Sequence, residues 1–291
     1  MKDDNIFDID KCTEKFPSFS VAMCVYKKDN PVWFDKAIHS VIVQTVKPKE
    51  IVLVVDGFIP PEIENIIDKY KRDSSGIIFR VVRLKRNRGH GIARKKSVMA
   101  CSTEIVALMD ADDISNKERF EQQLIKMVST KSEIVGGDIS EFIEDENKIV
   151  AYRKVPTDDM EIKKFMKKRC PMNQVTVMFK KDAYDRAGGY RDWYCEEDYY
   201  LWLRMAGKGA VFANTGTVLV NVRVGGEMYK RRGGLKYFKS EAKLQIYMWK
   251  HRFIGFWRCT LNIFLRFIVQ VLLPNNMRGW VFRKFARGEN S

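Results

Sequence analysis

Two groups of carboxylate residues in this 291-residue chain are spaced closely enough to bind a metal ion or to take part in proton transfer. Asp110, Asp112 and Asp113 follow an apolar run, and Glu197 and Asp198 open a segment with helical character. Like charges packed this closely repel unless a cation binds between them, and carboxylate oxygens are suitable ligands for Mg²⁺ or Mn²⁺. A carboxylate can also take the proton of an attacking hydroxyl group. The two groups therefore predict a metal site and a general base.

Each group also has a purely structural interpretation. Asp113 is expected to cap the helix that follows it, because Asp is a favoured N-cap residue. Glu197 and Asp198 are favoured in a first helical turn by the helix dipole alone. For Asp110 and Asp112 we favour the metal interpretation, since apolar strands of parallel sheets end where ligands bind.

The elements that position these residues follow from the hydrophobic pattern. The expected strands are 19–25, 50–55, 77–84 and 104–109, and the expected helices are 31–44, 60–71 and 91–100. This β-α-β order indicates an α/β fold with a parallel, doubly wound sheet and right-handed crossovers. After residue 113 we expect helices to about 128, at 183–187 and at 195–205, strands at 133–139, 174–179 and 211–224, and a loop at 149–159.

The order of six motifs resembles that of the family 2 glycosyltransferases, inverting enzymes of the GT-A fold, over residues 19–226. The motifs are FSVAMCVY (19–26), SVIVQT (40–45), EIVLVVDG (50–57), NRGHGIARKKS (87–97), DADD (110–113) and EEDYYLWLR (196–204). The resemblance implies a Rossmann-like, mostly parallel sheet with helices on both faces. It divides the chain into an N-terminal extension (1–17), a catalytic domain (18–228) and a basic helical tail (229–291); the catalytic domain has a nucleotide-binding half (18–113) and an acceptor half (114–228).

The same resemblance implies roles for individual residues. The implied donor nucleotide-binding residues are Val25, Tyr26, Asp56, Asn87, Gly91, Arg94, Asp110, Ala111 and Asp112. Asp112 would hold Mn²⁺ or Mg²⁺, and Asp110 would reach the donor ribose or a metal-bound water. Asp198 is the implied base and Glu197 binds the acceptor hydroxyl, while Arg223 is expected to meet the acceptor's pyrophosphate. No histidine lies near residues 222–226, so phosphate and water are expected to complete the metal site.

The net charge of +15 is concentrated beyond residue 223, where basic residues far outnumber acidic ones. A long apolar stretch at 253–273 carries a polar residue at every fourth position: Arg258, Asn262, Arg266 and Gln270. Arginines are costly in the middle of a bilayer, so we expect an interfacial amphipathic helix and not a transmembrane span. We favour attachment of 229–291 to an anionic membrane surface. The alternative is a helix that packs its apolar face on the catalytic domain, and nucleic acid is not expected because no nucleic-acid-binding fold is recognisable.

The function implied is transfer of a hexose, galactose or glucose, from a UDP-sugar to GlcNAc or GalNAc on an undecaprenyl-diphosphate lipid. A β1,3 linkage is expected, because the DADD motif and the VRVGG segment are similar to those of bacterial O-antigen and exopolysaccharide transferases. The expected location is the cytoplasmic face of the inner membrane, as a peripheral protein, since the N-terminus lacks a secretory signal and the six cysteines form no CxxC pair. Two alternatives stay open: a transferase that uses dTDP-rhamnose, UDP-HexNAc or another donor, and a catalytically silent scaffold that binds nucleotide or membrane.

Overall fold

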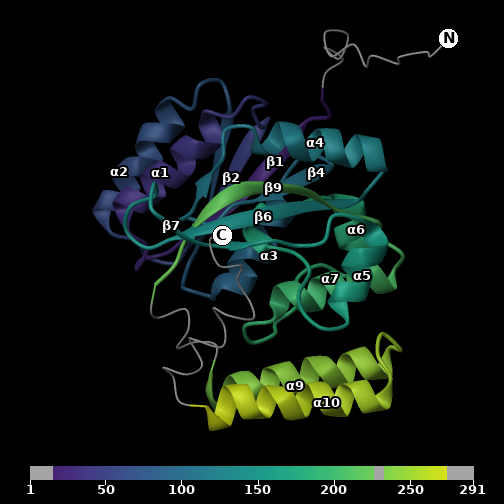
Figure 1. Ribbon diagram of the computed structural model, residues 1–291. Helices are drawn as coiled ribbons and strands as arrows, with labels where there is room; N and C mark the ends of the chain where they lie inside the picture. The colour runs from purple at the N-terminus through teal and green to yellow at the C-terminus, as the bar shows by residue number, and fades with distance from the viewer. Residues whose placement is uncertain (1–15, 226–232, 274–291) are drawn as a thin grey trace, which may run out of the picture.

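A nine-stranded sheet forms the centre of the molecule in this computed structural model, which describes residues 16–225 and 233–273 (Figure 1). The strands are β1 (Phe19–Val25), β2 (Glu50–Asp56), β3 (Ile78–Leu84), β4 (Ile105–Leu108), β5 (Ile114–Ser115), β6 (Ile134–Phe142), β7 (Ile149–Arg153), β8 (Met178–Lys180) and β9 (Phe212–Arg223). Their order is β3-β2-β1-β4-β8-β6-β9-β5, with β7 paired to β6. The α/β expectation is therefore confirmed.

The sheet is parallel in its first half and mixed in its second. β1 pairs in parallel with both β2 and β4, and β2 pairs in parallel with β3. β8 then inserts antiparallel between β4 and β6, while β6 and β9 pair in parallel. All residues of β1, β2 and β4 except Cys24 are buried, because helices cover both faces of this part of the sheet.

Helices pack on both faces of the sheet. They are α1 (Pro31–Ile42), α2 (Pro61–Arg72), α3 (His90–Ala100), α4 (Arg119–Thr130), α5 (Asp159–Met166), α6 (Lys181–Arg186), α7 (Glu197–Gly207), α9 (Gly234–Lys250) and α10 (Phe256–Phe267), with a 3₁₀ turn η2 (Gln174–Thr176) and a π-helical turn η3 (Ile268–Leu272). Alternate strand residues point to opposite faces, so Val21 joins the core under α1, α2 and α4, and Ala22 joins the core under α3, α5, α6 and α7.

Local signals explain why the first helix begins where it does. The side chain of Asn30 accepts hydrogen bonds from the backbone N–H groups of Val32 and Trp33, and Pro31 occupies the first helical turn. Asn is a preferred N-cap and Pro fits the first turn because its missing N–H has no partner there. The helix therefore starts directly beyond the carboxyl end of β1.

The structure corrects three expectations in the second half. The expected loop at 149–159 contains β7, an edge strand whose partly exposed residues pair antiparallel with β6, and the first residue of α5. The expected strand at 174–179 is the turn η2 followed by the three-residue β8. The helix expected directly after Asp113 is preceded by β5, and α4 begins only at Arg119. β7 shows no alternation of polar and apolar residues, and none of its five residues is fully buried, so its sequence lacks the usual signal of a strand.

The last two described helices form a hairpin beneath the rest of the molecule (Figure 1). α9 and α10 pack against each other, and buried residues of both, Leu244 and Cys259 among them, join the core cluster that contains α7. None of the helices in the described residues has the length and apolar character needed to cross a bilayer. The tail beyond Leu273, with its alternating aromatic and basic residues, lies outside the described residues.

Candidate functional site

The DADD motif lies just beyond the carboxyl end of β4, as the sequence predicts. Asp110 accepts a hydrogen bond from Arg94 Nη2 at 2.8 Å, and His90 Nε2 lies 3.9 Å from the same carboxylate oxygen. Burial opposes ionisation of Asp110, but the charge and hydrogen bond of Arg94, with the charges of His90 and Arg119, together lower the pKa of this carboxyl group. Ala111 is buried and Asp112 is exposed, so the motif presents one ion-paired and one exposed carboxylate.

Arg94 connects the two acidic groups that the sequence analysis treats separately. It comes from α3, is only 4% exposed, and its Nη1 lies 3.6 Å from Glu197 Oε1. Burial disfavours its charge, but Asp110 and Glu197 raise the pKa of the guanidinium above its ordinary value. Nη1 is buried and finds no hydrogen-bond partner within the described ranges. The arginine expected to contact the donor thus lies between the two sets of carboxylates.

Glu197 and Asp198 occupy the first turn of α7 and are both half-buried. Asp198 Oδ1 accepts the backbone N–H of Tyr199 at 2.7 Å, which fixes the carboxylate against its own helix. Burial and the neighbouring Asp198 charge raise the pKa of Glu197, and Arg94 opposes that shift. The two acids therefore differ in their contacts, since Glu197 faces Arg94 and Asp198 is held by the backbone of its own helix.

Asp56, the acid at the end of β2, holds the loop before α3. Its two carboxylate oxygens accept the backbone N–H groups of Arg88 at 2.7 Å and Gly89 at 3.0 Å. Asn87 Nδ2 in turn donates to the backbone carbonyl of Asp56 at 3.3 Å. A Cβ at Gly57 would lie 2.5 Å from the backbone nitrogen of Asn87, so only glycine permits this close approach.

The other predicted nucleotide-binding residues lie around the same edge of the sheet. Val25 is the buried last residue of β1, and Tyr26 is 38% exposed beside it. Gly91 is in the first turn of α3, next to the loop that Asp56 holds. The ends of β1, β2 and β4 thus bring most of the predicted donor residues to one edge, as parallel pairing requires.

Asp29 is a candidate functional residue that the sequence analysis missed. It follows β1, which is the neighbour of β4, and its Oδ2 accepts the backbone N–H of Tyr26 at 2.9 Å. Burial and the charges of Asp112 and Asp110 raise the pKa of Asp29 to about 7. The available signal was its position just past the carboxyl end of a strand predicted to be parallel to the acidic one.

Arg223 lies beside the DADD motif. Its backbone N–H donates to Asp113 at 2.8 Å, its Nε donates to the backbone oxygen of Asp112 at 3.4 Å, and its guanidinium stacks over the Trp33 ring at 4.3 Å. Asp113 is buried, and burial together with the charge of Asp112 raises its pKa well above the ordinary value. The expectation that Asp113 caps a helix is therefore wrong, because its carboxylate binds the end of β9.

The carboxylates suit a divalent metal only if ligands from outside the protein complete the site. Among the described residues, no three His, Cys, Asp or Glu side chains gather closely enough to hold a metal ion together. Asp110 and Asp112 offer hard oxygen ligands, and their charges add to burial in raising the pKa of the neighbouring Asp29. This donor set suits Mg²⁺ or Mn²⁺ that takes its remaining ligands from phosphate and water.

A family model described as glycosyl transferase family 2 matches residues 20–187. The chain belongs to the family 2 glycosyltransferases.

Three relatives match this transferase almost from end to end. It is 37% identical over 270 residues to a glycosyltransferase of Haemophilus influenzae, with 92% of this chain and 99% of that one covered. It is 35% identical over 272 residues (93% and 97% covered) to the Escherichia coli UDP-Gal:alpha-D-GlcNAc-diphosphoundecaprenol beta-1,3-galactosyltransferase. It is 32% identical over 271 residues (93% and 100% covered) to the amylovoran biosynthesis glycosyltransferase AmsE of Erwinia amylovora.

Solved structures confirm the GT-A fold of this transferase. The S. aureus TarS 1–349 complex with UDP-GlcNAc aligns with a TM-score of 0.63 at 15% identity, covering 86% of this chain and 72% of that one. The mannosyltransferase PcManGT from Pyrobaculum calidifontis, in complex with GDP-Man and Mn²⁺, aligns with a TM-score of 0.62 at 14% identity, covering 95% and 77%. At this identity the likeness establishes the fold alone.

Proposed function

We propose that this transferase moves galactose or glucose from its UDP form to GlcNAc or GalNAc carried on undecaprenyl diphosphate. The product would be a β1,3 linkage in an O-antigen or capsule precursor. The observation that supports the proposal is the Arg94 bridge, in which one guanidinium pairs with Asp110 of the DADD motif and with Glu197, the neighbour of the candidate base Asp198. The choice of substrates is supported by the name of the E. coli relative.

The reaction needs charge stabilisation at one end and proton removal at the other. As the acceptor hydroxyl attacks the anomeric carbon, the bond to the diphosphate breaks and its electrons leave with UDP. A bound Mn²⁺ or Mg²⁺ would neutralise that diphosphate, and Asp110 and Asp112 are the residues that would hold the metal. Asp198 would accept the hydroxyl proton and Glu197 would orient the hydroxyl group. Attack from the opposite side converts an α-linked donor to a β-linked product.

Other residues would make the remaining contacts with the donor and the acceptor. The backbone around Asp56 and Asn87 shapes the loop that would lie over the nucleotide, and Arg94 would balance the charge of both acid groups. Arg223 lies beside Asp112, where a guanidinium suits a phosphate group. A lipid-linked acceptor would place the reaction at the cytoplasmic face of the inner membrane, with 229–291 as the peripheral attachment.

One assay tests the chemistry. The full chain is incubated with UDP-Gal, UDP-Glc, UDP-HexNAc or dTDP-rhamnose and a GlcNAc- or GalNAc-diphospho-lipid analogue, with Mn²⁺ or with EDTA. We expect transfer from UDP-Gal or UDP-Glc that chelation abolishes. Asp198→Asn should lower kcat by about a hundredfold or more while the protein still binds UDP. Transfer that survives EDTA would disprove the metal role, and full activity of Asp198→Asn would disprove the base. Transfer from no donor would favour a silent scaffold.

A further inference from the structure

One face of the α9–α10 hairpin, on α10 and η3, exposes large apolar residues while polar residues of the same segment are buried. In α10 and η3, Asn262 and Gln270 are 5% and 4% exposed. Apart from Arg258 and Thr260, the exposed residues are large and apolar: Phe256, Trp257, Leu261, Phe264, Leu265 and Leu272. Trp257 is 81% exposed and Phe264 is 59% exposed. A helix on a water-facing surface has the opposite distribution, so this face is built for a partner that is not water.

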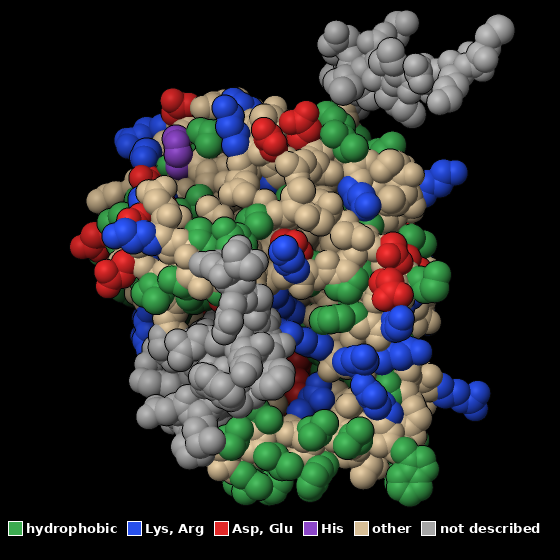
Figure 2. Space-filling model, viewed as in Figure 1, with side chains coloured by type: hydrophobic (Ala, Val, Ile, Leu, Met, Phe, Trp, Pro, Cys, Tyr) green, Lys and Arg blue, Asp and Glu red, His purple; other side chains and the backbone are tan. Residues whose placement is uncertain are grey.

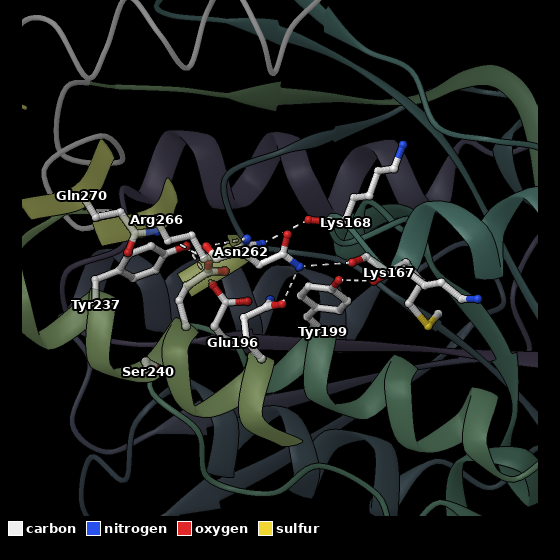
Figure 3. Close-up of polar contacts among 12 residues, drawn as sticks. Lys167, Lys168, Glu196, Tyr199, Tyr237, Ser240, Asn262, Arg266 and Gln270 are labelled. Atoms are coloured by element: carbon white, nitrogen blue, oxygen red, sulfur yellow. Dashed lines mark hydrogen bonds and ion pairs between the residues drawn. The ribbon is translucent and has the colours of Figure 1, made fainter. Parts of the chain in front are cut away.

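Buried polar contacts fix this orientation (Figure 3). Asn262 Nδ2 donates to Gln245 Oε1 of α9 at 2.8 Å, and Arg266 is ion-paired with Glu241. Burying Asn262, Arg266 and Glu241 without partners would be costly, and these contacts supply the partners. Rotating α10 to hide its apolar face would break these contacts. The apolar residues of the described part of the tail therefore divide into two groups: Leu244 and Cys259 pack on the core that contains α7, while the large apolar residues of α10 are exposed.

Aromatic rings gather where the two helices of the hairpin meet. Trp249 at the end of α9 lies 5.6 Å from the Phe256 ring at the start of α10, and Phe256 lies 5.5 Å from Trp257, measured between ring centroids. Trp is enriched where a membrane meets water, because its amphipathic ring is stable at the level of the lipid headgroups. The turn of the hairpin is thus suited to the same boundary.

Basic residues border the apolar face. The basic end of α5 contacts α10 directly, since Asn262 Nδ2 donates to the backbone oxygen of Lys167 at 3.5 Å and Arg266 Nη2 to that of Lys168 at 3.1 Å. Both lysines are exposed, and Figure 2 shows Lys and Arg side chains next to the hydrophobic group at the bottom of the molecule.

We propose that one face of the molecule, the docking face, binds the surface of an anionic lipid bilayer. The docking face consists of the six exposed apolar residues of α10 and η3 together with Lys167 and Lys168. The apolar side chains would enter the boundary between headgroups and acyl chains, and the lysines would contact anionic headgroups. A second copy of this chain is a poorer partner, because its own lysines would be brought to the same interface. The lipid-linked acceptor of the proposed function would lie in this bilayer.

The test measures binding alone, so its failure is distinguishable from failure of the proposed chemistry. Full-length protein is floated in a density gradient with phosphatidylcholine vesicles, with or without phosphatidylglycerol. We expect flotation with the anionic vesicles, and at least about a tenfold lower bound fraction for Trp257→Ser/Leu261→Ser/Phe264→Ser, because three apolar side chains no longer leave water. Lys167→Glu/Lys168→Glu should lose the preference for phosphatidylglycerol.

Matched controls come from other faces. Ile125 and Val128 of α4 are 52% and 63% exposed, so Ile125→Ser/Val128→Ser removes comparable apolar surface and should float like the wild type. Lys95→Glu/Lys96→Glu makes the same change of charge on α3. Circular dichroism shows that each variant is folded. Equal flotation of the triple variant, equal loss in the α4 control, or absence of wild-type flotation would each overturn the proposal. So would a wild-type dimer that the triple variant dissociates.

Discussion

Arg94 donates a hydrogen bond to Asp110 at 2.8 Å, and this buried pair joins the two halves of the site. The same guanidinium reaches toward Glu197 of α7, so the end of β4 and the start of α7 share a single positive charge. Changes on either side should therefore be felt on the other. The bridge makes the charge of this site a property of three residues together.

Arg94→Met should leave Asp110 and Glu197 without their shared cation. Removing one partner of a buried ion pair costs about 3 kcal/mol of unfolding free energy, and we expect activity to fall by about a hundredfold. Chemical denaturation and initial rates measure the two effects. Lys95→Met on the exposed side of α3 should change neither. If Arg94→Met and Asp110→Asn were additive in a double-mutant cycle, the pair would not be coupled.

Gly57→Ala should displace the loop that Asp56 holds. Gly57 has φ of 86°, and an added Cβ would lie 2.5 Å from the Asn87 backbone nitrogen. We expect a raised KM for the donor together with a loss of stability of about 2 kcal/mol or more. Gly209→Ala is the matched control, because Gly209 has φ of 81° but nothing within 4 Å of the added atom. Equal effects of the two changes on KM would contradict a specific role for the loop contact.

The stability of the protein should depend on pH through Glu196. This buried residue accepts a hydrogen bond from Tyr237, and burial and the charge of Glu241 raise its pKa well above the ordinary 4.5. A raised pKa in the folded state means that its contribution to stability is complete below pH 4.5 and is lost as pH rises through the raised value. Asp198 on α7 and Arg266 on α10 are the other charged groups that act on this cluster.

Glu196→Gln keeps a neutral side chain of the same shape and should remove that loss. The free energy of unfolding of the wild type, relative to this variant, should therefore fall as pH is raised from 5 to 9, a range above the ordinary pKa. Urea denaturation at several pH values measures it. Parallel curves for the two proteins would show that Glu196 does not titrate in this range.

Arg266→Met should destabilise the hairpin. The guanidinium is ion-paired with the buried Glu241, and its loss would leave that carboxylate without its cation, at a cost of about 3 kcal/mol. Arg258→Met provides the control, because Arg258 lies on the same sequence stripe but is exposed. Thermal unfolding compares the two. A similar drop in Tm for both variants would mean that the Glu241 contact contributes little.

The sequence predicted the nucleotide-binding half of the fold well because its signals are local. The buried run of β2 and the Asn30-Pro31 start of α1 each depend on neighbouring residues alone. The position of Asp110 beyond a parallel strand followed from the same pattern. This pattern did not predict which charged residues pair with one another across the site. Arg94 and Glu197 are far apart in sequence, and only the packing of α3 against α7 reveals that they meet.

The direction in which the polar stripe faces is a second feature that the sequence pattern could not predict. Spacing by four places Arg258, Asn262, Arg266 and Gln270 on one side of a helix; Asn262 and Gln270 are buried and Arg266 pairs with Glu241, but Arg258 is exposed. Periodicity does not state which side faces the protein, because that depends on what the partner helix offers. Here α9 offers Glu241 and Gln245, so the polar side turned inward. Asp113 was misassigned for the same reason, since its partner lies on the distant β9.

The hairpin lies directly beneath α7, whose first turn carries Glu197 and Asp198 (Figure 1). A bilayer bound to the docking face would hold these acids at one fixed height above the lipid headgroups. A sugar attached straight to a lipid diphosphate lies near that height, whereas the outer end of a long glycan does not. The hairpin would then set the distance between these acids and the bilayer. That distance would restrict the enzyme to short acceptors, at an early step of chain assembly.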